Sequence, residues 1–220
     1  IRRQRQMCIR DSYITVEEKP LFVIFDPAAF KDATHFMKLW NKLAKENGLK
    51  GIYFVGRCDA LPSMNKNNLK QIDNLTKPRY DEMFSLGYDG INSVTLKYAE
   101  FKTTGVFHKA IHSVARKYLE GILLDKYKYD KIMNNFVTPE DYEWGVYPQL
   151  IPRRDRSPRS GRKAMIYYDS TPEKFKVAAE NAIKCVEGRD MDHRLIFLNA
   201  WNEWGAVSYT HLRAHETELH

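Results

Sequence analysis

Residues 21–56 read LFVIFDPAAFKDATHFMKLWNKLAKENGLKGIYFVG, and this stretch decides the fold. Its first five residues form a continuous apolar run, which is typical of a strand buried on both faces, and the turn signal Asp26-Pro27 follows. Residues 32–48 then have the apolar period of a helix, with Asp32 as a candidate N-cap and Asn47-Gly48 as its end. Residues 50–56, KGIYFVG, predict the next strand, which completes a βαβ unit within 36 residues. The expected apolar face of the helix consists of Phe36, Leu39, Trp40, Leu43 and Ala44.

The same alternation of short apolar strands and helices continues along the chain, and it is typical of an α/β fold around a parallel sheet. The last unit is the clearest, because Ser170 and Glu173 have the spacing of a capping box and Gly188 is suited to the helix end. The further expected elements are strands at 88–94, 164–169 and 194–201 and helices at 106–127 and 170–188.

Length and composition limit the class of protein. The 220 residues suffice for one domain with a sizeable core, although an eightfold α/β barrel usually needs about 250. An apolar content of 43% excludes a disordered chain, and no apolar run approaches the roughly 18 residues of a membrane span. The net charge of +7 favours a solvated basic surface over a nucleic-acid-binding patch.

Cysteine and histidine spacing gives no sign of a disulfide framework or a metal site. Cys8, Cys58 and Cys185 are odd in number and widely spaced, which favours a reducing, cytoplasmic location. His108 and His112 are four residues apart but lack the acidic residue of a metal-binding helix motif. We therefore expect neither a metal ion nor another cofactor.

The two ends of the chain differ from the rest. RRQRQMCIRDS and VSYTHLRAHET are similar to peptides that arise when sequencing-adapter DNA is translated at the ends of assembled contigs. Neither end has an apolar period suited to packing on a core. We therefore expect residues 1–12 and 206–220 to be non-native and residues 13–205 to be the biological part.

FLNAWNEWG, residues 197–205, places polar and aromatic side chains at the end of the last expected strand. Ligands of parallel α/β folds bind at the carboxyl ends of strands, where the following loops converge. A partly desolvated Glu203 can exchange protons, Asn202 can fix hydroxyl groups, and indole rings can stack on sugar faces. A core Trp201 and a solvated Glu203 are the alternative interpretation. The candidate sugar-binding residues are Asn199, Trp201, Asn202 and Trp204.

NAWNEWG resembles the signature of the WbsX-type glycosyltransferase family, whose members are described as containing a glycoside-hydrolase-family-99-like domain. LFVIFDPAAF, GYDGI, IPRRDRSPR and STPEKF are similar to other segments of that family, and the resemblance covers most of residues 20–205. It implies a partial (β/α)8 TIM-type barrel, of which this chain supplies the second half only. It also implies action on sugar linkages in polysaccharide metabolism, with a carbohydrate or a sugar nucleotide as substrate.

The resemblance further implies a catalytic role for one carboxylate. Glu203 matches the first acid of the family's Asn-Glu-Trp-x-Glu-Gly motif, which in related hydrolases assists attack by the sugar's own 2-hydroxyl group. The second acid, which acts as acid/base, belongs where this chain has Ala206. Glycoside chemistry ordinarily uses two carboxyl groups, so we expect the chain as written to be inactive. Transferase and hydrolase both stay open, and a non-catalytic saccharide-binding domain is the alternative.

Six basic residues crowd the loop at 151–163. Arginine side chains there are suited to the diphosphate of a nucleotide sugar, or Asp155 and Arg159 fix a sugar or a neighbouring loop. A solvated loop or a structural Arg–Asp pair is the alternative, and the absence of interleaved aromatic residues disfavours nucleic acid. Asp26 and Asp169 also follow expected strands, where each either faces the site or caps a turn.

Overall fold

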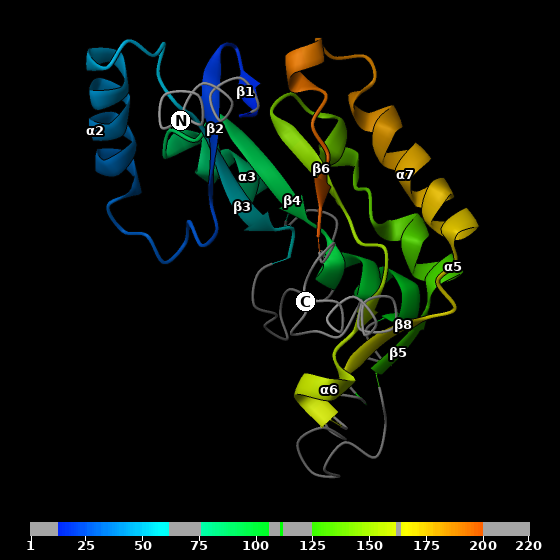
Figure 1. Cartoon of the computed structure of the whole chain (residues 1–220). Coiled ribbons are helices and arrows are strands. Elements are labelled where there is room, and N and C mark those ends of the chain that lie inside the picture. Colours follow the sequence, from blue (N-terminus) through cyan, green and yellow to red (C-terminus); the bar gives the residue numbers. More distant parts are fainter. Residues whose placement is uncertain (1–12, 62–75, 106–110, 112–124, 162–163, 200–220) are drawn as a thin grey trace, which may run out of the picture.

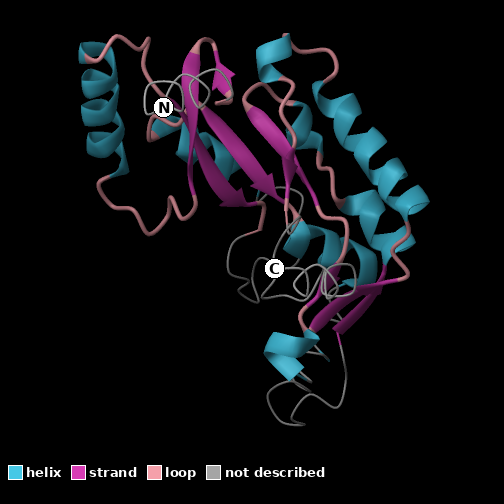
Figure 2. Ribbon diagram, viewed as in Figure 1, coloured by secondary structure: helices cyan, strands magenta, loops and turns pink. Residues whose placement is uncertain are grey.

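Figure 1 shows the computed structural model, which describes residues 13–61, 76–105, 111, 125–161 and 164–199. Within these residues, parallel strands form the main sheet, and their order across the sheet is their order along the chain. The short β1 (Thr15–Val16) pairs antiparallel with the start of this sheet. The sheet is curled like part of the wall of a barrel (Figure 2), which confirms the predicted α/β class. The parallel strands are β2 (Lys19–Ile24), β3 (Tyr53–Asp59), β4 (Gly90–Val94), β6 (Val146–Leu150) and β9 (Phe197–Leu198).

Helices pack against the outer face of the curl (Figure 1). α2 (Ala33–Glu46) connects β2 to β3, α3 (Thr76–Ser85) precedes β4, and α7 (Pro172–Val186) lies beside β6. Residues 96–105, which follow β4, are also helical. The core between the sheet and these first helices includes Ile24, Met37, Phe54, Cys58, Tyr80, Met83, Ile91 and Val146.

A second, smaller sheet lies beyond the carboxyl ends of the main strands (Figure 1). Its strand order is β5 (Asp125–Lys128), β8 (Met165–Tyr168) and β7 (Arg154–Asp155), with β5 and β8 parallel. An aromatic core of Tyr127, Tyr129, Phe136 and Tyr167 holds it against the rest of the molecule. The short helices of this region and of the chain after α7 are α5 (Tyr129–Ile132), η3 (Met133–Asn135), η4 (Pro139–Tyr142), α6 (Ser157–Ser160) and η6 (Met191–His193).

The GYDGI segment has structural roles at the amino end of β4. The Asp89 carboxylate accepts a hydrogen bond of 2.8 Å from the backbone N–H of Phe54, which joins the start of β4 to β3. A Cβ atom on Gly90 would lie 2.7 Å from Cε2 of Tyr147 and 3.2 Å from Cε1 of Tyr53. Only glycine therefore lets both aromatic rings pack directly on this strand.

The same two rings belong to a hydrogen-bond chain inside the curl. The Tyr53 hydroxyl donates to the carbonyl oxygen of Asp89 at 3.0 Å, and the Tyr147 hydroxyl lies 2.9 Å from the Tyr53 hydroxyl. The Tyr53 proton is thus used, so Tyr147 donates to Tyr53 and accepts from Nδ1 of His193 at 2.9 Å. Burial raises the pKa of both tyrosines, which keeps the hydroxyl protons in place.

Two predicted elements need correction. Residues 125–127, expected to end a helix over 106–127, belong to strand β5, and residues 106–110 and 112–124 lie outside the described part of the chain. The N-cap of α7 is Thr171, whose hydroxyl accepts from the backbone N–H of Lys174 at 3.4 Å, rather than Ser170. The Ser170 hydroxyl instead donates to the carbonyl oxygen of Pro152 at 2.6 Å, which ties the helix start to the loop after β6.

Several apolar side chains of the βαβ unit at residues 21–56 are more exposed than the sequence predicts. Phe22, Val23 and Phe25 are 36%, 38% and 73% exposed, because β1 pairs only with Lys19 and Pro20. Leu21 still bonds on the β1 side, where its backbone N–H donates to the carbonyl oxygen of Ile14 at 3.0 Å, and residues 21–24 pair with β3 on the other side. α2 shows the same effect, since Leu39, Trp40 and Leu43 of its predicted apolar face are exposed. The buried residues of α2 are Ala33, Met37 and Ala44.

We predict that Gly90→Ala lowers the free energy of unfolding by about 1–3 kcal/mol, because the added methyl group forces the Tyr147 and Tyr53 rings off the strand. Thermal or urea unfolding followed by circular dichroism measures this change. Gly188→Ala is the matched control, since no atom lies within 4 Å of a Cβ at that position. Equal stabilities of the two variants would contradict the role given to Gly90.

Candidate functional site

The carboxyl ends of the main strands meet at one edge of the sheet, which faces the smaller sheet (Figure 1). Asp26 follows β2, Asp59 ends β3 and Asn199 follows β9. The backbone N–H of Asn199 donates to the carbonyl oxygen of Leu150 at 2.8 Å, which extends the pairing of β9 with β6. Residues on distant parts of the chain thus arrive at a common edge, as the strand pattern predicts.

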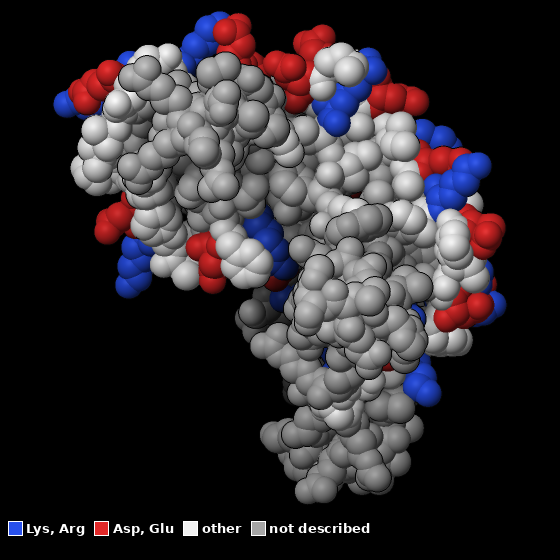
Figure 3. Space-filling model, in the orientation of Figure 1, with Lys and Arg blue, Asp and Glu red and all other residues white. Residues whose placement is uncertain are grey.

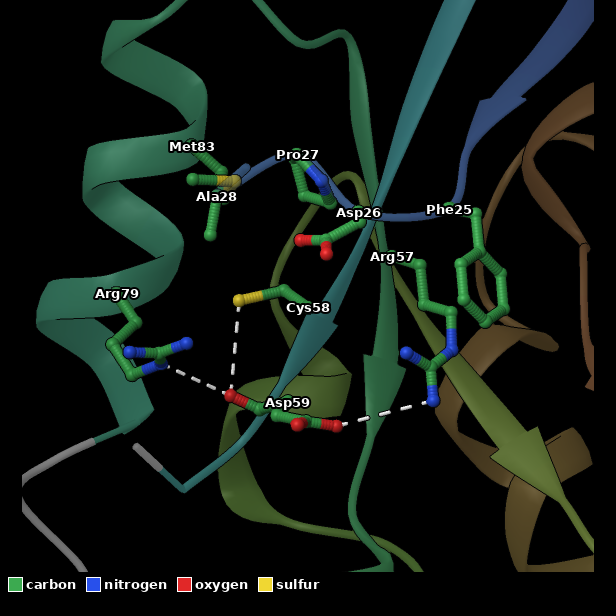
Figure 4. Close-up of a pocket in the computed structure, with 9 residues that line it drawn as sticks. All are labelled: Phe25, Asp26, Pro27, Ala28, Arg57, Cys58, Asp59, Arg79 and Met83. Atoms are coloured by element: carbon green, nitrogen blue, oxygen red, sulfur yellow. Dashed lines mark hydrogen bonds and ion pairs between the residues drawn. The ribbon is translucent and has the colours of Figure 1, made fainter. Parts of the chain in front are cut away.

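A cavity of about 180 Å³ opens at the ends of β2 and β3 (Figure 4). Figure 4 shows Arg57 and Cys58 on opposite sides of β3, with Cys58 toward α3. The Arg57 guanidinium lies 4.7 Å from the centre of the Phe25 ring, an aromatic side chain that is largely exposed. The cavity therefore combines an apolar platform with charged groups. Its lining residues are Phe25, Asp26, Pro27, Ala28, Arg57, Cys58, Asp59, Arg79 and Met83.

Asp59 organises the charges of this cavity. Its carboxylate lies 3.0 Å from Nζ of Lys97 and 4.0 Å from the Arg57 guanidinium. Its carbonyl oxygen accepts a hydrogen bond of 3.0 Å from Nε of Arg79. The local charge is thus largely balanced, which favours a polar uncharged ligand over a bare phosphate.

Two other polar groups of the cavity are explained by local structure. The Asp26 carboxylate accepts from the backbone N–H of Ala29 at 3.2 Å, which is the turn-capping role left open for it. Cys58 is buried, and burial raises the pKa of its thiol, so a reactive thiolate is disfavoured. The Cys58 thiol is therefore not suited to the role of nucleophile, whereas Asp26 both caps a turn and lines the cavity.

The arginine-rich loop is fixed by its own aspartate. One carboxylate oxygen of Asp155 accepts from the backbone N–H of Ser157 at 2.8 Å and from its hydroxyl at 2.6 Å. The Arg154 guanidinium lies 5.8 Å from the centre of the Tyr167 ring in the smaller sheet. Asp155 therefore holds the loop, and the side chain of Arg159 lies outside the described residues.

A second cavity, of about 250 Å³, lies between this loop and β8. Asp169 stands at its edge with a left-handed backbone, φ 61°, which aspartate tolerates better than most residues. Its carboxylate lies 2.6 Å from Nζ of Lys174 and 3.5 Å from Nζ of Lys128, and the hydrogen bond from Lys174 lowers its pKa. The lining residues are Arg153, Asp155, Ile166, Tyr167, Tyr168, Asp169 and Ser170.

The structure describes only some of the residues that the sequence predicts to carry the chemistry. Asn199 and Asp155 are described, whereas Trp201, Asn202, Glu203 and Trp204 lie outside the described residues. Sequence reasoning missed Arg57, Asp59 and Arg79 as site residues. The sequence did carry a signal for Arg57 and Asp59. They continue, beyond residue 56, the alternation of side chains between the two faces of the strand.

Metal-binding clusters and membrane-spanning helices are both absent from the described residues. These residues contain no group of three or more His, Cys, Asp or Glu side chains arranged to hold a metal ion. No helix in the described part of the chain is long and apolar enough to cross a membrane. On the face shown in Figure 3, acidic and basic side chains are interspersed along the described rim of the molecule.

The model of the family described as "Glycosyltransferase WbsX" matches residues 2–212. The chain belongs to the WbsX glycosyltransferase family. It is also similar to two proteins named "Uncharacterized protein WxcX", from Xanthomonas campestris pv. campestris strains ATCC 33913 and B100. Each is 20% identical over 198 residues, which are 89% of this chain. The chain spans 25% of the length of each of these relatives, and no solved structure matches it.

We predict that Asp155→Ala increases tryptic cleavage within residues 153–163 of this WbsX-family chain about fivefold to tenfold. The loss of two hydrogen bonds to Ser157 makes local opening easier by roughly 1 kcal/mol. Mass spectrometry of timed digests measures the rate. Asp26→Ala is the control, since it removes a turn cap elsewhere, and an unchanged rate for Asp155→Ala would remove the structural role.

Proposed function

We propose that the chain carries part of the sugar-binding and glycosyl-transferring centre of a polysaccharide-metabolising enzyme. The observation that carries this proposal is the common edge at which parallel strands of a WbsX-family chain deliver Phe25, Arg57, Asp59 and Asn199. An exposed aromatic ring beside paired charged groups suits a polyhydroxylated ligand, because the ring covers its apolar face while the polar groups engage its hydroxyl groups.

A partial (β/α)8 barrel of the TIM type is the architecture we propose for this region. The parallel strands β2, β3, β4, β6 and β9 pair in chain order, as a barrel requires, and the sheet curls with helices outside. In such barrels the catalytic residues follow the carboxyl ends of strands. The chain spans 25% of its relatives' length, so the activity of those whole proteins does not follow from this architecture.

We assign the catalytic carboxylate to Glu203. This residue comes four positions after Asn199, whose backbone is bound to the end of β6, and it matches the first acid of the family's motif. Its proposed role is to assist attack at the anomeric carbon, with Asn202 holding hydroxyl groups and Trp204 covering the sugar ring. The acceptor of the sugar, water or a second saccharide, decides between hydrolase and transferase.

A second candidate function is a non-catalytic saccharide-binding domain. Ala206 favours it, because this residue stands where the motif has its second acid, and a methyl group cannot protonate a leaving oxygen. Both candidate functions require saccharide binding, and only the first requires turnover.

We predict that Ala206→Glu brings turnover to the chain and that adding Glu203→Gln abolishes it, by a factor of about 10³ or more, without loss of the fold. Release of free sugar or of nucleoside diphosphate from a panel of sugar nucleotides and oligosaccharides measures turnover. Glu187→Gln is the matched control, since Glu187 is exposed at the end of α7. Turnover that survives Glu203→Gln would remove this residue from the mechanism.

Trp204→Ala tests the saccharide binding that both candidates require. We expect it to weaken saccharide binding by roughly 1–3 kcal/mol, in the range of a lost stacked aromatic ring. Binding without turnover in the Ala206→Glu variant would favour the binding domain. The absence of saccharide binding in every variant would contradict both candidates.

A further inference from the structure

The strand register reveals a polar layer inside the curl. Val55 is paired with Gly90, and Arg57 is paired with Asn92, so these residues share one face of the sheet. Tyr147 is paired with Asn92 and packs with Val55 in the inner core cluster, which identifies this face as the inner one. The opposite face carries Phe54, Cys58 and Ile91, which pack toward the helices.

The inner face becomes polar one step beyond the inner core cluster, and on β4 it is apolar again at Val94, two residues after Asn92. On β3, β6 and β9, the residue two positions after Val55, Tyr147 and Phe197 of the inner core cluster is polar. On β4, the residue two positions after Gly90 is also polar. Since residues two apart on a strand share a face, these polar side chains all belong to the inner face. The members of this polar layer are Arg57, Asn92, Gln149 and Asn199.

Two amides in this layer are buried without a partner for their oxygen. Asn92 and Gln149 are only 7% and 6% exposed. The side-chain oxygen of each is fully covered and accepts no hydrogen bond. Buried polar atoms of native proteins are nearly always hydrogen-bonded, so two such oxygens on neighbouring strands require a reason. A ligand hydroxyl group is one candidate donor to them, because Asn92 is paired with Arg57, which lines the cavity at the ends of β2 and β3.

We propose that Asn92 and Gln149 hold hydroxyl groups of one sugar residue of the substrate. The inference rests on the proposed function, and it identifies the part of the sheet that binds the sugar. A carboxamide presents an acceptor and a donor in one plane, and each sugar hydroxyl both donates and accepts. Arg57 is paired with Asn92 in the strand register. Its guanidinium lies over the Phe25 ring, so the polar layer extends as far as that ring.

The charges around this layer indicate an uncharged sugar residue rather than a phosphate. Arg57, a member of the layer, and Lys97 lie against the Asp59 carboxylate, at 4.0 and 3.0 Å. A phosphate at this place would meet that carboxylate and compete with it for the same cations. The unpartnered amide oxygens are acceptors, which a sugar hydroxyl satisfies and an ionised phosphate oxygen does not, so the amide layer takes a neutral ring.

Nearly isosteric apolar variants test the assignment. Asn92→Leu and Gln149→Met remove an unpartnered buried oxygen, so we expect the melting temperature of the ligand-free protein to stay the same or rise. We expect each variant to weaken binding of neutral saccharides about fivefold to tenfold, measured by calorimetry or saturation-transfer NMR with methyl glucoside, mannoside, galactoside and N-acetylglucosaminide. Binding of inorganic phosphate and of free nucleoside diphosphates should not change.

Asn41→Leu is the matched control, because the oxygen of that amide accepts from the backbone N–H of Ile52 at 2.8 Å. It should lower the melting temperature and leave saccharide affinity unchanged. If Asn92→Leu and Gln149→Met destabilise the protein as Asn41→Leu does, the two amides are structural and the inference is wrong.

The outcomes also separate this inference from the proposed function. Saccharide binding that is lost in Trp204→Ala but kept in both amide variants would leave the proposed function standing and overturn the inference. If the unaltered protein binds none of the saccharides, the inference and the proposed function are both overturned.

Discussion

The contact of the Tyr53 and Tyr147 rings with Gly90 is the constraint on which the rest of the structure depends. A side chain at position 90 would meet both rings, so the absence of one allows three neighbouring strands to share a dense inner core. The hydroxyl groups of the same rings are held by the Asp89 carbonyl oxygen and by His193. Packing and hydrogen bonding at the amino ends of the strands thus determine how the sheet curls. The curvature of the sheet in turn determines where the carboxyl ends of the strands meet.

The inner face of the sheet joins this core to the candidate site. Along each strand the side chains alternate between the helices and the inside, so every second residue after the core reaches the carboxyl edge. Core residues such as Val55 and Tyr147 are followed by Arg57 and Gln149 on that face. A rigid apolar layer therefore supports a polar one, an arrangement that restricts the movement of the polar side chains without any loop.

Local sequence signals predicted much of the fold but less of the site. The βαβ unit at residues 21–56 was predictable, because apolar periodicity and turn residues act over a few positions. Exposure of Phe22 and Leu39 was not predictable, since burial depends on what lies on the far side of a strand or helix. The expected capping box failed for a similar reason, as the Ser170 hydroxyl is used by Pro152, a residue of another loop.

By itself, the sequence determined the α/β class, the strand-end segment that follows β9 and the resemblance that the WbsX family match confirms. Only the tertiary structure decided which polar residues share a face. Arg57, Asn92 and Gln149 are far apart along the chain and belong to strands whose mutual register no local pattern encodes. Register arises from the packing of whole strands on one another, and a shift of one residue would turn each of these side chains toward the helices.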